Sequence, residues 1–235
     1  MDVDGRILVL CLCWSAELNF LLRSLAVSTR VLTLDEKMNA ATHALGAFLS
    51  LVGLLVFFVY PHQTFDALTT FSCLIFSASL LSVYLSSTFY HLALDPRKKQ
   101  NWKRWDHAAI FFLIAGTYTP FCLLIMPGPE ATQLLIWVWI LAGLGTLGEW
   151  FLAKRFRWMS TALYLALGWL VVWKWHLVKA VPDHILPLVI AGGLSYSLGT
   201  LFYLWRGIRF HHAIWHLFVI GGSAFHYMAV LLFFK

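Results

Sequence analysis

Seven long apolar stretches, almost free of Asp, Glu, Lys and Arg, dominate this sequence. A helix needs roughly 20 apolar residues to cross the hydrocarbon core of a bilayer. The connections are short and carry proline, glycine or basic residues, so they leave no room for a soluble domain. The sequence therefore predicts an all-α integral membrane protein, a seven-transmembrane helix bundle with spans near Asn39–Tyr60, Ala67–His91, His107–Met126, Ala131–Gly148, Trp158–Trp173, Asp183–Trp205 and Ala213–Phe234.

Composition supports this fold class and excludes others. Hydrophobic residues make up 60% of the chain and charged residues only 12%, which is too few charges to cover a soluble domain. The net charge of +6 would be compatible with nucleic-acid binding in a soluble protein. Here the charges fall between the apolar stretches, where they act as topology signals, so we expect no nucleic-acid partner.

The basic residues also predict the orientation of the spans. Fourteen of the 17 Lys and Arg residues lie on the side of the N-terminal segment, and the other side holds Lys174, Lys179 and Lys235. Basic residues concentrate in cytoplasmic loops. This distribution predicts a cytoplasmic N-terminus, an outside C-terminus and a multi-pass position in the cell membrane, which would be the inner membrane in a bacterium.

Two regions of the sequence allow more than one interpretation. Residues 1–34 contain the apolar run Ile7–Leu22, which lacks the basic start and cleavage site of a signal peptide. We interpret this segment as an interfacial helix or as sequence upstream of the natural start, and residues 35–235 as the membrane domain. Glu149, inside the fourth span, is expected to pair with Lys154 or Arg155, or else to be an inward-facing functional acid.

A pair of histidines at the start of the last span suggests a metal site. His212 and His216 are four residues apart, which places both imidazoles on one face of a helix. Soluble metalloproteases with this spacing have Glu after the first histidine, and this chain has Ala213. Any catalytic base must therefore come from another helix.

The predicted topology brings further polar residues to the same end of the bundle. The second span ends at His91, with Ser87 one turn earlier, and the third span is expected to start at Asp106. Ionisable groups at this depth are expected to face the bundle interior and to satisfy each other. Three imidazoles and a water would suit a tetrahedral zinc ion with an open position.

Other interpretations of these residues remain open at this point. His91 and His212 can be interfacial residues that face water, and Asp106 can pair with Arg104 or cap the third helix. His43 and His107 lie on the same side and are either donors to the metal ligands or inert.

The sequence resembles the hemolysin III branch of the progestin and adipoQ receptor family over about Leu34 to Phe234. Seven sets of residues carry this resemblance: Glu36-x-x-Asn39-x-x-x-His43-x-x-Gly46, Ser87-Thr88-Phe89-Tyr90-His91, Asp106-His107, Ala115-Gly116-Thr117-Tyr118-Thr119-Pro120, Leu163-Tyr164-Leu165 with Gly168-Trp169, Gly192-Gly193 with Tyr196 and Gly199, and His212-Ala213-Ile214-Trp215-His216-Leu217-Phe218.

The resemblance implies a seven-helix fold with the N-terminus inside and a zinc ion held by His91, His212 and His216. In related adiponectin receptors an aspartate reaches the zinc through water, and the matching residue here is Asp106. Ser87 matches the serine of the family's Ser-x-x-x-His motif. Related receptors and the alkaline ceramidases resemble zinc amidases that act on lipids, whereas the name of the bacterial branch refers to pore-forming lysis.

Three functions are compatible with these features. The first is a zinc-dependent hydrolase of a lipid amide or ester, in which Asp106 takes a proton from water and Ser87 donates to the oxyanion. The second is a receptor or regulator in which zinc is a structural clamp. The third, a cytolytic pore, is the weakest, because the spans are apolar all round. Membrane lipids are the expected partners, and the sequence predicts no oligomeric state.

Cysteine labelling tests the predicted orientation. A membrane-impermeant thiol reagent added outside should modify a cysteine introduced near Pro127 or Pro182, because these positions fall in outside connections. It should not modify one introduced near Lys98 or Arg155. Modification at Lys98 from outside would contradict the orientation.

Overall fold

The computed structural model describes residues 31–59, 65–151, 157–205 and 207–235, and within them it contains helices and no strand. Residues 34–235 form one compact unit, distinct from residues 1–33. The run Ile7–Leu22 lies outside the described residues. Among the described residues, seven helices are long and apolar enough to cross a membrane, as predicted. The elements are α2 (Leu34–Val59), α3 (Ala67–Leu92), α4 (Pro96–Pro120) with η1 (Phe121–Ile125), α5 (Pro129–Phe151), α6 (Arg157–Gly168) with η2 (Leu170–Lys174) and α7 (Trp175–Lys179), α8 (Leu186–Leu204) and α9 (His211–Phe233).

Aspartates outside the spans define the start of two helices. The Asp66 carboxylate accepts from the backbone N–H of Thr69, and the Asp95 carboxylate accepts from that of Lys98, both at 2.8 Å. Each is an N-cap, which satisfies a backbone donor that has no partner within the helix. The hydrogen bond from Lys98 also lowers the pKa of Asp95, since it stabilises the ionised carboxylate.

The prediction that the third helix starts at Asp106 was wrong, because α4 begins at Pro96. An apolar stretch marks only the part of a helix that lies in lipid, whereas the capped, polar first turns of α4 continue the same helix outwards. Proline suits the first helical position, because its missing N–H would have no partner there. Asp106 consequently lies inside α4 and does not cap it.

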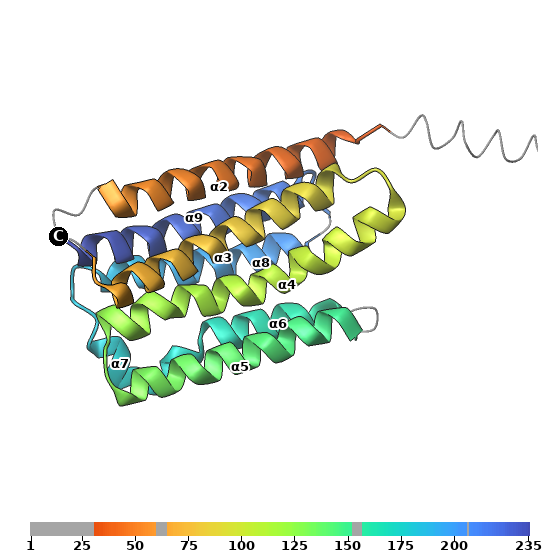
Figure 1. The fold of residues 1–235 in the computed structure, drawn as a ribbon. Coiled ribbons are helices and arrows are strands. Elements are labelled where there is room, and N and C mark those ends of the chain that lie inside the picture. Colours follow the sequence, from red (N-terminus) through yellow and green to blue (C-terminus); the bar gives the residue numbers. More distant parts are fainter. Residues whose placement is uncertain (1–30, 60–64, 152–156, 206) are drawn as a thin grey trace, which may run out of the picture. The chain divides into compact units, whose positions relative to one another are not determined.

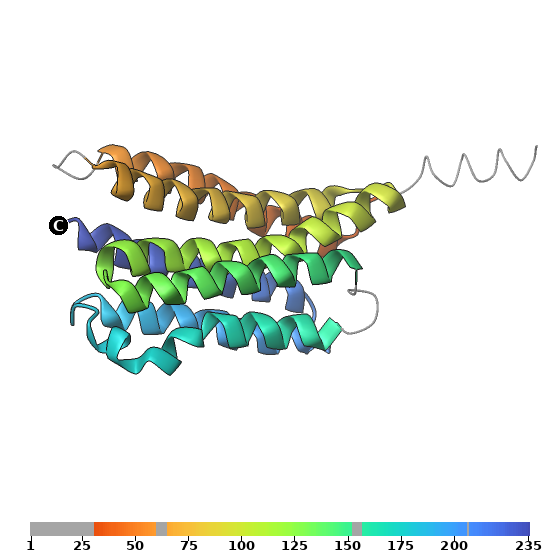
Figure 2. The same cartoon turned by 60° about the horizontal axis from the view of Figure 1, so that its bottom comes forward.

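Helix α4 is the centre of the bundle. In the span Pro96–Ile125, 72% of the residues in the apolar 18-residue segment are buried inside the structure. The corresponding share for α8 is 11%. Figures 1 and 2 both show α4 between α3 and α5, while α9 packs against α2 and α8. Because neighbouring helices run in opposite directions, the starts of α2, α4, α6 and α9 meet the ends of α3, α5 and α8 at one end of the bundle (Figure 1).

The fifth span differs from its predicted form. The sequence predicted one helix over Trp158–Trp173, but α6 ends at Gly168 and the chain continues to Lys179 as the short helices η2 and α7. The hydroxyl of Tyr118 donates to the Gly168 carbonyl at 2.9 Å and accepts from the Val171 N–H at 3.0 Å. A side chain of α4 therefore satisfies the backbone groups freed by the break, as a bilayer requires.

One aromatic side chain joins three helices near the middle of the bundle. Tyr84 of α3 is 2% exposed, and its hydroxyl donates to the Ser223 hydroxyl of α9 at 2.7 Å. A Cβ atom at Gly46 of α2 would lie 2.5 Å from the Tyr84 ring. Only glycine allows α2 and α3 to approach this closely, which is a common way of packing membrane helices.

Gly46→Ala should lower the free energy of unfolding by about 1–3 kcal/mol, the usual cost of overpacking. The measurement is thermal unfolding in detergent, followed by tryptophan fluorescence. Gly143→Ala is the matched control, because a Cβ there meets nothing within 4 Å. It should leave stability unchanged or slightly raised, since alanine is the better helix former. Equal stability of the two variants would contradict the close approach.

Candidate metal centre

Three histidines from two helices converge at the end of the bundle where α9 begins. His91 lies in the last turn of α3, and His212 and His216 lie in the first two turns of α9. One ring nitrogen from each lies within 4.8 Å of the others. His91 is 3% exposed and His216 is fully buried. His91 is therefore not a water-facing interfacial residue, and the three rings form a group that could hold a metal ion.

Contacts from α2 fix the orientation of two of these rings. The Nδ1 atom of His91 donates to the Glu36 carboxylate at 2.5 Å, and Lys99 donates to the other carboxylate oxygen at 2.7 Å. The Nδ1 atom of His216 donates to the Asn39 carbonyl at 3.1 Å and lies 2.9 Å from the Thr42 hydroxyl. Because a carbonyl only accepts, the proton of a neutral His216 ring must be on Nδ1.

The Nε2 atoms of the three rings show whether a metal ion would fit between them. The Nε2 atoms of His91, His212 and His216 are all buried, and none has a hydrogen-bond partner among the described residues. A buried polar atom without a partner costs about 1–3 kcal/mol. Metal-binding histidines commonly donate their other N–H to a carboxylate or a carbonyl, as His91 and His216 do here. The residues present therefore fit a metal ion bound through Nε2.

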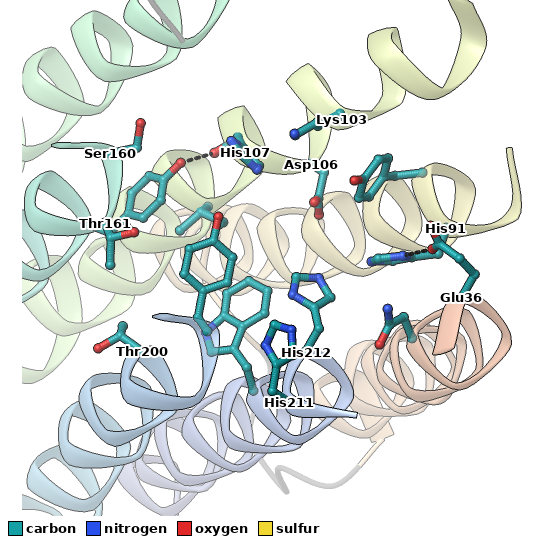
Figure 3. A pocket seen from close by; sticks show the side chains of 16 residues that line it. Glu36, His91, Lys103, Asp106, His107, Ser160, Thr161, Thr200, His211 and His212 are labelled. Atoms are coloured by element: carbon teal, nitrogen blue, oxygen red, sulfur yellow. Dashed lines mark hydrogen bonds and ion pairs between the residues drawn. The ribbon is translucent and has the colours of Figure 1, made fainter. Parts of the chain in front are cut away.

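Asp106 and Ser87 lie beside the three histidines. Asp106 is 3% exposed, and Figure 3 shows its carboxylate directed into the space between His91 and His212. The Ser87 side chain is fully buried and faces Asp106, yet its hydroxyl has no partner of good hydrogen-bond geometry among the described residues. The five candidate site residues predicted from the sequence therefore lie together in the fold, and their roles stay predictions.

The sequence indicates no role for Glu36 and Asn39 of α2, and it predicts that His43 of the same helix is either a donor to the metal ligands or inert. Glu36, Asn39 and His43 are spaced by three and four positions, so they share one face of a helix, and this spacing was the available signal. His43 is 1% exposed, and its ring stacks on that of His216 with centroids 3.5 Å apart. Neither ring nitrogen of His43 has a hydrogen-bond partner among the described residues, so His43 contacts the His216 ring by stacking and does not donate to a ligand.

The sequence left two pairings open for Glu149, the acidic residue of the fourth span. The two pairings considered for Glu149 involve Lys154 and Arg155, which are outside the described residues. The observed partners of the buried Glu149 carboxylate are His107, Ser160 and Tyr164.

A polar cavity of about 320 Å³ opens beside the histidine group. Figure 3 shows side chains of α3, α4, α6 and α9 around it, including His91, Asp106 and His212. A second cavity of about 220 Å³ lies deeper in the bundle and is lined mainly by apolar side chains. The two share four lining residues: Ile110, Tyr164, Thr200 and Trp215.

Comparison with known proteins assigns the chain to a family. The family described as Haemolysin-III related matches residues 32–227. The chain belongs to this family. Hemolysin-3 of Bacillus cereus is 39% identical to it over 202 residues, which cover 85% of this chain and 91% of the relative. The Hemolysin-3 homolog of Bacillus subtilis (strain 168) is 41% identical over 200 residues, with coverage of 85% and 94%.

A more distant relative supports the wider superfamily. The human monocyte to macrophage differentiation factor is 28% identical over 207 residues, which cover 83% of each chain. The hemolysin III family assignment, the seven spans and the multi-pass membrane location predicted from the sequence are thus confirmed.

Metal content should fall strongly when one of the three histidines is replaced and less when a partner of a histidine is replaced. His91→Ala, His212→Ala and His216→Ala should each remove most of the zinc and lower thermal stability, because the ion would tie α3 to α9. Glu36→Gln should weaken zinc binding about 10–100-fold, since it alters the partner of His91. Elemental analysis and chelator competition on purified protein measure both effects.

His184→Ala is the matched control for these substitutions. His184 precedes α8 and does not belong to the histidine group, so this variant should retain its zinc and its stability. Full zinc occupancy in His212→Ala would contradict the site.

Proposed function

We propose that this hemolysin III family protein is a zinc-dependent hydrolase of a lipid amide or ester. The observation that carries the proposal is that His91 and His212 of the histidine group line a cavity that the buried Asp106 also lines. A metal clamp with only a structural role needs no such cavity. The orientation predicted from the basic residues would place this site at the cytoplasmic end of the bundle.

Zinc is the metal that we propose because neutral imidazole nitrogens suit it, and three protein ligands leave a position for substrate or water. When bound, it would supply a Lewis acid that polarises a carbonyl oxygen and makes water more acidic. His91 and His216 would hold it in an orientation set by Glu36 and Asn39.

Asp106 and Ser87 would act on the substrate and on water. The Asp106 carboxylate, directed into the cavity, would accept a proton from the attacking water as general base. The Ser87 hydroxyl is buried and without a well-formed hydrogen bond among the described residues. It would donate to the carbonyl oxygen as negative charge develops there.

The two cavities together support a lipid as the substrate. The polar cavity would hold the scissile amide or ester, and the apolar cavity would receive a hydrocarbon chain. Shared lining residues such as Ile110 and Trp215 place the two next to each other. A small polar substrate would leave the apolar cavity without a purpose.

The competing function is a receptor or regulator in which zinc is structural. The ligands come from α3 and α9, which are far apart in sequence, so a bound ion would stabilise the bundle whether or not it is catalytic. The alternative thus shares the ligands with the hydrolase but needs neither the cavity nor Asp106 as a base.

Asp106→Asn separates the two functions. It retains a side chain of nearly the same shape but removes the proton acceptor, so zinc should stay bound while turnover falls about 10²-fold or more. The measurement is product release from a panel of lipid amides and esters by wild-type, Asp106→Asn and chelator-treated protein. A wild-type protein without hydrolysis, or equal rates in all three samples, would exclude the hydrolase.

A further inference from the structure

A second polar cluster lies in the same region of the bundle. His107 of α4 donates through Nδ1 to the Glu149 carboxylate of α5 at 3.3 Å. The other oxygen of this carboxylate accepts a short hydrogen bond from the Ser160 hydroxyl of α6. The Tyr164 hydroxyl lies 3.4 Å from that oxygen and donates to the His107 carbonyl at 3.0 Å. Side chains of three helices therefore fix the position of Glu149.

Ser160 and Tyr164 of the cluster line the cavity with hydroxyls that already donate, whereas His107 lines it with one ring nitrogen unused. Glu149 is 3% exposed and does not line the cavity, whereas the His107 side chain is 18% exposed and does. Nδ1 of His107 is occupied by the carboxylate, and its Nε2 has no hydrogen-bond partner among the described residues. A carboxylate that holds Nδ1–H fixes the ring and directs Nε2 to a substrate.

His107 also follows Asp106 directly in the chain, and both line the cavity beside His91 and His212 (Figure 3). The proposed hydrolysis of an amide needs two proton transfers, one from water and one to the departing nitrogen. An alkylamine does not leave as an anion, so a proton donor must reach the nitrogen. The proposed function assigns Asp106 to the first transfer and assigns no group to the second.

We propose that His107, positioned by Glu149, is the proton donor to the leaving group, an inference that rests on the proposed hydrolase function. The water oxygen bonds to the carbonyl carbon while Asp106 takes a proton from that water. The C–N bond breaks, and the Nε2 proton of His107 moves to the nitrogen. The proton held by Asp106 then returns to His107 through water in the shared cavity, so the net reaction adds one water across the C–N bond.

The same cluster could instead serve only to attach α6. Few residues of α6 pack against its neighbours, and Ser160 and Tyr164 connect it to α4 and α5. A structural attachment and a proton donor differ in one measurable respect. Loss of an attachment slows every substrate, whereas loss of a proton donor slows only substrates whose leaving group needs a proton.

The experiment compares two substrates with the same fatty acyl chain, an N-alkyl amide and a 4-nitrophenyl ester. Nitrophenolate leaves without protonation. His107→Gln should lower kcat for the amide about 10²-fold or more and change that for the ester less than about threefold. Glu149→Gln should show the same selectivity with a smaller loss. Each protein is assayed in detergent with its zinc content measured.

Trp139→Phe is the matched control, because it removes a 3.3 Å hydrogen bond from α5 to Thr119 of α4 outside both cavities. It should affect the amide and the ester equally. Equal losses on both substrates in His107→Gln, an unchanged rate on the amide, or loss of zinc would overturn the role of His107 while leaving the hydrolase intact. Absence of zinc-dependent hydrolysis in the wild type would overturn both.

Discussion

A buried imidazole nitrogen without a partner is costly, and this bundle gathers several at one place. The Nε2 atoms of His91, His212 and His216 are buried and have no hydrogen bond within the described residues. Each such atom costs about as much as a lost hydrogen bond. A cation bound by the three rings would give each Nε2 atom a partner. The observed hydrogen bonds to His91 and His216 are made at Nδ1, so they orient the rings and leave Nε2 for such a cation.

The rest of the end region is organised around that group. Helix α2 contributes no ring nitrogen to it, yet Glu36 and Asn39 hold the outer nitrogens of His91 and His216. Further along, Gly46 lets α2 approach Tyr84 of α3, whose hydroxyl reaches α9. The same three helices are therefore joined twice, once by the contacts of the rings and once by close packing in the middle of the bundle.

Much of this could be predicted from the sequence because two strong rules apply. The length of an apolar stretch gives the spans, and antiparallel neighbours bring His91, Asp106 and His212 to one end. The failures have local causes. Apolar length says nothing of polar turns, so the start of α4 was placed ten residues late, at Asp106 instead of Pro96. The break after Gly168 depends on Tyr118, a residue distant in sequence, and Glu149 found partners on α4 and α6.

The early start of α4 has one more consequence. The residues before Asp106 add ten positions, or about 15 Å of helix at 1.5 Å per residue, beyond the level of the three histidines. Lys99 lies on this extension and shares the Glu36 carboxylate with His91. A charge at the polar margin of the bundle is thereby connected through one carboxylate to a buried ring. Because Lys99 is partly exposed, the ions of the surrounding solution can screen its charge and thereby act on the carboxylate that also holds the buried His91 ring.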